Sequence, residues 1–442
     1  MKKIVFYICL LSVGTLSLQS CDKYLDIQPV GTVVPKTIED FRGLMTSGYQ
    51  GFPSHKSYLT LRTDEVLLDE YSTDVASVKD IYLWKDANPD PNTISMPYVG
   101  FYKSIFYANH IIANIDTEVG STTEAKQVKA EAYLMRAYAH FELLNLYADN
   151  YSTANAGKRG VPLSLKVDLE QVFVPATIEQ SYAQVMADMK EAASLMQVVD
   201  QDAKVKYRFS KRVLHAFEAR VHLYRSEWQE ALAAAEAALA INGDLEDLNV
   251  TSALLPSDFQ SKEMILSLEK VAIPSVKNST YISTSLLNSY NKDNDMRFVR
   301  YFQKRGGDYI SLKGGDNKYN VSFRNADLYL IVAEAYAQLG NTDKAVEKLG
   351  VLLQKRLKPT YYTQQMSALS KEGATQLLVS IAAERNRELA LEGQRWYDLK
   401  RSTRPEITHS FVGTDYVLRA NDPRYVIRYP QVAIDNNPEL GF

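Results

Sequence analysis

Cysteine is nearly absent from this chain of 442 residues, which contains only Cys9 and Cys21. No cysteine follows residue 21, so the rest of the chain has no disulfide, no thiol nucleophile and no thiolate ligand for zinc. The fold therefore depends on a hydrophobic core, and the chain is long enough to bury a large one.

The sequence also lacks an excess of positive charge. It has 50 Lys and Arg residues against 53 Asp and Glu residues, which gives a formal net charge of −3. Nucleic acids need a basic partner surface because their phosphates are negatively charged. The charge balance therefore argues against a nucleic-acid partner.

Common catalytic and nucleotide-binding motifs are missing as well: there is no G-x-S-x-G, no P-loop and no H-E-x-x-H. His215, Glu218 and His222 have helical spacing, but the two histidines are separated by about 10.5 Å along a helix. That separation is too long for both to bind one metal ion. We interpret these residues as part of helix packing.

An incomplete calcium loop begins at Asn291, with Asp293 and Asp295 in the next ligand positions. Met296 replaces the glycine of the sharp turn, and Phe302 replaces the bidentate glutamate. These differences argue against a calcium loop of this type. We expect no metal and no cofactor, although a calcium site with ligands from other segments stays open.

Charged residues are dense between residues 383 and 401, where Glu388 and Glu392 lie one helical turn apart. Such a pair is a candidate for acid/base catalysis. Each acid has an arginine three or four residues away, and this pairing stabilises a helix without raising the pKa as a general acid requires. We predict a structural role with these pairs: Arg385–Glu388, Glu392–Arg395, and Asp398 with Arg401 or Arg395.

The N-terminus has the form of an export signal. Lys2 and Lys3 precede an apolar stretch over residues 4–18, which is shorter than the ~20 residues of a membrane span. The cysteine that follows resembles the lipobox of bacterial lipoproteins, and an ordinary secretory signal is the alternative. We predict three segments: a signal peptide over residues 1–20, a tether over 21–36 lipidated at Cys21, and one domain over 37–442.

Long stretches rich in Ala and Leu predict an all-α fold. Thr177 and Gln180 form a capping-box pattern at the start of one helix. Segments starting at Ala219 and Ala333 align at an offset of 114 residues, and the second fits the tetratricopeptide pattern. Two unrelated alanine-rich hairpins are the alternative. We predict tetratricopeptide-like helix pairs over residues 127–196, 211–240, 325–355 and 375–401.

Two segments rich in Gly, Pro, Asn and Asp, residues 48–100 and 271–320, interrupt the helices. The second contains two Gly-Gly pairs that favour hairpins, and the chain after Pro405 is expected to be irregular. Loops on a rigid scaffold often carry binding residues. We therefore place the ligand site on these two segments.

Tyrosine is abundant, with 29 Tyr against 15 Phe, and its ring and hydroxyl suit contact with sugars. Trp84 is the strongest single candidate because the residues around it predict no helix that would bury an indole. Its ring is either a plug against the domain or a face offered to a ligand. The predicted ligand-binding residues are Trp84, Tyr71, Tyr98, Tyr281, Tyr290, Tyr309, Asp64, Glu65 and Asn288.

Several motifs along the chain occur together in one protein family: "CDKYLDIQP", "LNLYADNY", "NADLYLIVAEAYAQLGNTDKAVEKL", "RNRELALEGQRWYDLKR" and "YPQVAIDNNPELGF". With these motifs the sequence resembles the SusD/RagB family of Bacteroidetes surface lipoproteins. The resemblance implies a SusD-like helical fold that is lipid-anchored at the outer membrane and has no enzymatic activity. It also implies a SusC-like TonB-dependent transporter as partner and a glycan as ligand, or a peptide in the RagB branch.

Two other classes of protein stay open at this point. An all-helical glycan hydrolase would need a carboxylate pair in the loops, for which Asp64 with Glu65 or Asp69 with Glu70 are candidates. A scaffold that binds only proteins would have no small-ligand pocket lined by Tyr and Trp.

Overall fold

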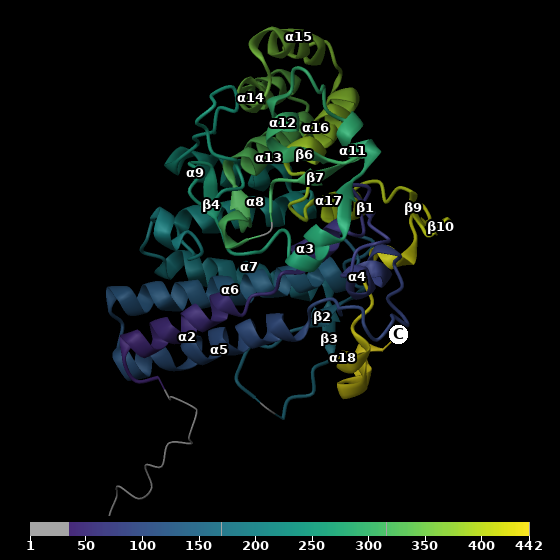
Figure 1. The fold of residues 1–442 in the computed structure, drawn as a ribbon. Helices are drawn as coiled ribbons and strands as arrows, with labels where there is room; N and C mark the ends of the chain where they lie inside the picture. Colours follow the sequence, from purple (N-terminus) through teal and green to yellow (C-terminus); the bar gives the residue numbers. More distant parts are fainter. Residues whose placement is uncertain (1–34, 169, 315, 442) are drawn as a thin grey trace, which may run out of the picture.

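The structure is a computed structural model that describes residues 35–168, 170–314 and 316–441, and it is mostly helical (Figure 1). The α-helices are α2 (Ile38–Gln50), α3 (His55–Thr60), α4 (Val75–Tyr82), α5 (Val99–Val119), α6 (Thr123–Tyr147), α7 (Ile178–Leu195), α8 (Lys211–Arg225), α9 (Trp228–Ile241), α10 (Pro274–Asn278), α11 (Thr284–Asn288), α12 (Met296–Tyr301), α13 (Asn325–Gln338), α14 (Thr342–Gln354), α15 (Pro359–Leu369), α16 (Ala374–Glu388), α17 (Arg395–Arg401) and α18 (Gln431–Asn436). The short 3₁₀ helices are η2 (Ala203–Val205), η3 (Asn317–Tyr319), η4 (Pro423–Tyr425) and η5 (Pro438–Leu440).

The strands form antiparallel pairs only, as far as the described residues show. They are β1 (Val66–Leu68) with β5 (Thr280–Ile282), β2 (Arg159–Pro162) with β3 (Pro175–Thr177), β4 (Met264–Leu266) with β8 (Phe323–Arg324), β6 (Phe302–Arg305) with β7 (Asp308–Ser311), and β9 (Ile407–Phe411) with β10 (Thr414–Leu418). The helical fold predicted from the sequence is confirmed.

Helix α6 is the central element of a layer that also contains α2, α5 and α7 (Figure 1). Thr122 caps its first turn by accepting a hydrogen bond from the Ala125 amide at 3.1 Å. Residues on nearly every side of α6 are buried, because α5 and α7 pack on it. The capping box predicted for α7 is present, with Thr177 and Gln180 bonded reciprocally.

The hairpins α8–α9 and α13–α14 repeat at the predicted offset. Helices α8 and α13 begin at residues 211 and 325, and α9 and α14 begin at 228 and 342, so both differences are 114. The turns match too, because Ser226 and Gly340 both have a positive φ, of 60° and 79°. The prediction of related hairpins is confirmed, while their tetratricopeptide character stays a prediction.

The charged segment that contains Glu388 is buried, but its pairing differs from the prediction. Glu388 accepts hydrogen bonds from Arg297, Arg324 and Arg356, which lie on other elements. Arg385, the predicted partner of Glu388, instead contacts aspartates. The local spacing was misleading because these side chains point into the core, where distant arginines reach them.

Glu392 also departs from the prediction. It pairs with Arg324 at 3.0 Å and with Lys313 at 2.6 Å, rather than with Arg395. The predicted contact between Asp398 and Arg401 is present at 2.9 Å. The ion pairs of this segment therefore connect different elements of the core to one another.

The two loop segments and the chain after Pro405 contain more regular structure than their composition indicated. Gly306 and Gly307 close the β6–β7 hairpin as predicted, whereas the second Gly-Gly pair includes Gly315, outside the described residues. The chain after Pro405 is not simply irregular, since it forms the β9–β10 hairpin. The predicted signal peptide and Cys21 also lie outside the described residues, and Pro35 in the predicted tether is already buried. Within the described ranges, no helix has the length and hydropathy needed to cross a membrane.

Candidate ligand-binding site

Trp84, the strongest candidate from the sequence, is a core residue in the structure. Its side chain is only 1% exposed, and its Nε1 donates a hydrogen bond to the Arg62 carbonyl oxygen at 3.1 Å. The ring of His409 stacks on it with the centroids 4.1 Å apart. Of the two roles predicted for Trp84, this burial favours the plug, and the residue also belongs to the lining of the cavity described below as the basic cavity.

The sequence did not predict how deeply Trp84 is buried, because two nearby elements were missed. Helix α4 ends at Tyr82, two residues before Trp84, and strand β9 carries the stacking His409. The His409 nitrogens lie 2.7 and 2.8 Å from the carbonyl oxygens of Tyr82 and Thr63, so the ring is held rigidly in place. Burial lowers the pKa of His409.

Tyr98, another predicted residue, belongs to a cluster of three tyrosines beside the C-terminal segment. The ring of Tyr147 stacks on Tyr429 at 4.5 Å, and Tyr98 meets both rings edge-on at 6.0 and 5.5 Å. The Tyr147 hydroxyl donates a hydrogen bond of 2.9 Å to the Pro97 carbonyl oxygen. The cluster therefore fastens the predicted loop to the end of α6.

Two cavities adjoin this tyrosine cluster. The first, here called the apolar cavity, has a volume of about 700 Å³ and is lined by Tyr98, Val99, Phe106 and Val432, among others. Phe106 is 41% exposed, and the two valines are more exposed still. Volumes of this size are typical of sites for small ligands.

The second cavity, here called the basic cavity, has a volume of about 690 Å³. Its lining includes Tyr147, so the tyrosine cluster contributes one ring to each cavity. The C-terminal segment reaches it because the Ile427 amide donates to the Leu146 carbonyl oxygen at the end of α6. Arg404 and Arg428 also line this cavity.

Lys400 fixes the end of α6 that forms part of the basic cavity. Its ammonium group donates hydrogen bonds to the carbonyl oxygens of Asn145 and Ala148, at 2.6 and 2.5 Å. A cation at this position stabilises the C-terminal end of a helix dipole. Burial, together with the positive charge of the nearby Arg404, lowers the pKa of Lys400 to about 7.

The other predicted tyrosines do not gather in one place. Tyr71 is 91% exposed, whereas Tyr290 is buried and its hydroxyl donates to the Arg387 carbonyl oxygen at 2.6 Å. Tyr281 and Tyr309 lie on the neighbouring strands β5 and β7, and the Arg305 guanidinium lies 5.0 Å from the centre of the Tyr281 ring. Both are half-buried, and together they form a separate aromatic surface.

The predicted polar residues are largely engaged with the protein itself. Arg395 donates two hydrogen bonds to the Asp64 carboxylate, at 2.9 and 2.8 Å. Glu65 is buried and accepts a hydrogen bond of 2.7 Å from the Leu391 amide. Burial raises the pKa of Glu65 to about 7. Asn288, at the end of α11, is exposed.

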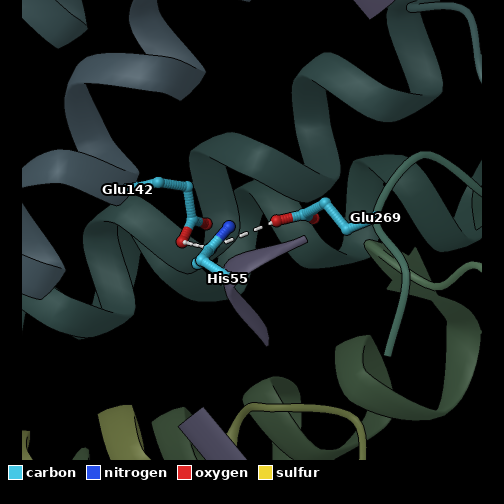
Figure 2. A group of neighbouring side chains, drawn as sticks. All are labelled: His55, Glu142 and Glu269. Carbon is cyan, nitrogen blue, oxygen red and sulfur yellow. Dashed lines mark hydrogen bonds and ion pairs between the residues drawn. The ribbon is translucent and has the colours of Figure 1, made fainter. Parts of the chain in front are cut away.

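A group of possible metal ligands lies deep in the core, where His55 faces Glu142 and Glu269 (Figure 2). The His55 Nε2 atom is 2.8 Å from Glu142 and 3.4 Å from Glu269. Lys56 pairs with Glu269 at 2.7 Å, and Tyr397 donates to Glu142 at 2.8 Å. A divalent cation would be repelled by the adjacent ammonium, so the donor set fits an internal ion-pair network better than a metal site.

The electrostatics of Glu142 agree with an ion-pair network. Burial alone would raise its pKa, but the hydrogen bond and charge of His55 and the charges of Lys56 and Arg220 lower the pKa to about 2. The carboxylate is therefore ionised in the core. This group joins α3, α6 and the segment that follows β4, and it lies outside both cavities.

Sequence reasoning missed the basic cavity because its lining comes from four separate parts of the chain. Lys85 follows α4, Lys158 precedes β2, Arg404 follows α17 and Arg428 precedes α18. The cluster of Arg419, Arg424 and Arg428 in the C-terminal segment was the available signal, since the chain as a whole is slightly acidic.

Comparison with known proteins relates the sequence and the fold of this chain to one family. A family model named SusD-like_3 and described as "Starch-binding associating with outer membrane" matches residues 23–223. SusD-like protein P38 of Formosa agariphila is 25% identical over 481 aligned residues, which cover 90% of this chain and 91% of that protein.

Solved structures show the same fold. A SusD superfamily protein from Bacteroides thetaiotaomicron has a TM-score of 0.76 and 21% identity, covering 91% of this chain and 98% of that one. A laminarin-binding SusD-like protein has a TM-score of 0.61 and 19% identity, covering 83% of this chain and 92% of that one. The chain therefore matches the SusD-like family model over residues 23–223 and shares the fold of SusD superfamily structures over most of its length.

Proposed function

We propose that this protein is a SusD-like, lipid-anchored protein of the cell surface that captures a glycan and delivers it to a SusC-like TonB-dependent transporter. The observation that carries the proposal is the tyrosine cluster, whose rings line two adjoining cavities of ligand size. The family description and the laminarin-binding relative support a saccharide as the ligand.

The two cavities offer complementary contacts to a sugar chain. The C–H faces of a pyranose pack on apolar surface, which Phe106, Val99 and Val432 expose in the apolar cavity. The charged groups of the basic cavity can bond to hydroxyls. A chain that crosses the tyrosine cluster would therefore meet both kinds of surface.

The arrangement of Asp64 and Glu65 favours binding over catalysis. The two oxygens of Asp64 are both occupied by Arg395, and Glu65 is 1% exposed. Neither residue lines the apolar cavity or the basic cavity. A general acid has to reach its substrate, so the buried Glu65 lacks the access that a hydrolase requires, and Asp64 is held as the ionised partner of Arg395.

The proposal is tested by titration calorimetry of residues 22–442 against laminarin, starch and acidic oligosaccharides. Phe106→Ala is expected to lower the affinity for the saccharide roughly tenfold, by analogy with base–aromatic stacking, while the melting temperature stays unchanged. Val379→Ala, an exposed apolar residue on α16, is the matched control. Binding of no saccharide, or hydrolysis of one, would contradict the proposal.

A further inference from the structure

Positive charge is concentrated in the basic cavity. Its cationic lining residues are Lys85, Lys158, Arg159, Arg404, Arg424 and Arg428, and its acidic lining residues are Asp86 and Asp149. Six cations against two carboxylates leave a formal excess of four positive charges. This excess contrasts with the net charge of −3 for the whole chain.

The two carboxylates in the lining are already bound by other groups. Asp86 receives two hydrogen bonds from Arg62, at 2.7 and 3.0 Å, and Arg62 is not part of the cavity lining. Asp149 is shared by Arg404 and by Lys158, whose ammonium lies 3.0 Å away. Asp149 is therefore shared by two cations of the lining, and Asp86 is neutralised by an arginine outside the lining.

The remaining cations differ in how well they are paired. Arg424 is bound by Asp422 at 2.7 Å. Lys85 is 47% exposed, and its ammonium is 3.8 Å from Asp80, which is a loose contact. The Arg428 side chain makes no hydrogen bond or ion pair with the described residues, and its Nη1 atom is buried. An unpaired guanidinium nitrogen in a partly desolvated wall is costly unless a ligand completes it.

We propose that the basic cavity recognises an anionic group, a carboxylate or a sulfate, carried by the glycan. This inference rests on the proposed function and narrows its ligand to an acidic saccharide. The planar guanidinium of Arg428 can donate paired hydrogen bonds to two oxygens of such a group, and Lys85 adds a mobile charge. Pro423 and Val426 in the same lining offer apolar contact to the adjoining sugar ring.

Another cavity, here called the lysine cavity, provides a comparison within the same molecule. It has a volume of about 730 Å³ and is lined by Lys204, Lys206, Lys270 and Lys318. Two of these are paired, Lys206 with Asp200 at 3.0 Å and Lys318 with Asp258 at 2.9 Å. Its lining contains no arginine, so it lacks a guanidinium group that can donate two parallel hydrogen bonds to one anionic group.

The experiment measures the affinity of residues 22–442 for three saccharides and for a hexaglutamate peptide by titration calorimetry. Oligogalacturonate carries carboxylates only, κ-carrageenan oligosaccharide carries sulfates only, and laminarin oligosaccharide is neutral. The variants are Arg428→Gln and Lys85→Gln. The matched control is Lys270→Gln, at an exposed lysine that lines the lysine cavity. Melting temperatures confirm that each variant is folded.

We expect tighter binding of one acidic saccharide than of laminarin, and the tighter acidic ligand identifies carboxylate or sulfate as the recognised group. Arg428→Gln should lower the affinity for that ligand roughly tenfold to a hundredfold. Lys85→Gln should lower it less, and Lys270→Gln should leave it unchanged. Added salt should weaken the acidic ligand more than laminarin.

Three results would overturn the inference. Preference for laminarin, with Arg428→Gln unaffected, would leave the proposed function intact and remove the anionic ligand. Loss of acidic-saccharide binding in Lys270→Gln but not in Arg428→Gln would assign the binding site to the lysine cavity. Binding of a hexaglutamate peptide with none of the three saccharides would overturn both the inference and the proposed function.

Discussion

Glu65 has a buried carboxyl group whose protonation should affect stability near neutral pH. Its pKa is raised from 4.5 to about 7 in the folded protein, mainly by burial. The folded state therefore binds the proton more tightly than the unfolded state does. The stability that this group contributes is fully present below pH 4.5 and is lost as the pH rises through 7.

We predict that Glu65→Gln becomes more stable relative to the native protein as the pH increases from 4.5 to 8. The full change is roughly 3 kcal/mol, because each pKa unit corresponds to ~1.4 kcal/mol. Urea unfolding at several pH values measures this difference, with the exposed Glu70→Gln as control. A difference that stays constant with pH would contradict the assignment.

At the scale of single residues, the sequence predicted few of the residues that line the two cavities. Tyr98 was identified and lines the apolar cavity. Trp84 was identified and belongs to the lining of the basic cavity, but its indole is covered by His409 from a distant part of the chain. Arg428 was not identified at all. Composition predicts the local backbone, whereas the burial of a side chain depends on contacts with segments far away in the sequence.

At the scale of the element, the two related hairpins differ in the residue that ends their first helix. Ser226 and Gly340 both adopt the left-handed conformation, which glycine adopts without strain and serine does not. We predict that Ser226→Gly raises the free energy of unfolding by a few tenths to ~1 kcal/mol. Gly340→Ala should lower it by about 1 kcal/mol, because open space around that position leaves only backbone strain.

Chemical denaturation of the two variants measures these changes. Gly373→Ala, at a glycine without a positive φ and with no atom near the added methyl group, is the control for Gly340→Ala. Changes of the same sign in Ser226→Gly and Gly340→Ala would show that the turns are not equivalent.

The elements were predicted unevenly for a physical reason. The hairpins α8–α9 and α13–α14 repeat their small residues at one offset, so each copy supports the other. Strands β9 and β10 form an isolated pair of five residues each, with Thr, His, Ser and Asp among the apolar residues. Such short strands depend on their partner and on the surface they cover, and their own composition resembles a loop.

At the scale of the whole molecule, an ion-pair network centred on Glu388 connects distant segments of the C-terminal half. Its acidic members are Asp295, Glu263, Glu384, Glu388 and Glu392, and its basic members are Arg297, Arg324, Arg356, Arg387 and Lys313. Burial would raise the pKa of Glu388, but Arg356, Arg324 and Arg297 hold it well below its usual range. The five carboxylates balance the five cations.

We predict that Glu388→Gln destabilises the protein by about 3–5 kcal/mol, because three buried arginines lose their common partner. Saccharide affinity of the folded variant should be unchanged, since Glu388 lies outside both cavities. Thermal unfolding and calorimetry measure the two effects, with the exposed Glu347→Gln as control. Weaker binding at an unchanged melting temperature would assign Glu388 to the ligand site.

The repeated hairpins are the predicted contact with the transporter. In Figure 1, α9 lies on the side of the molecule away from α4, β9 and α18, near which the two cavities open. We predict that Ala233→Arg and Ala240→Arg, at exposed positions of α9, abolish co-purification with the SusC-like transporter and leave saccharide binding intact. Ala420→Arg, beside β10, is the control. Retained co-purification would contradict this division of the surface.

The most direct test of the central claim is a crystal structure of the protein with the saccharide that calorimetry identifies as its ligand. We predict electron density for sugar rings in the apolar and basic cavities, in contact with Phe106 and Arg428, on both sides of the tyrosine cluster. Density on the exposed face of α9 and α14, or only on the surface formed by Tyr281 and Tyr309, would contradict the account.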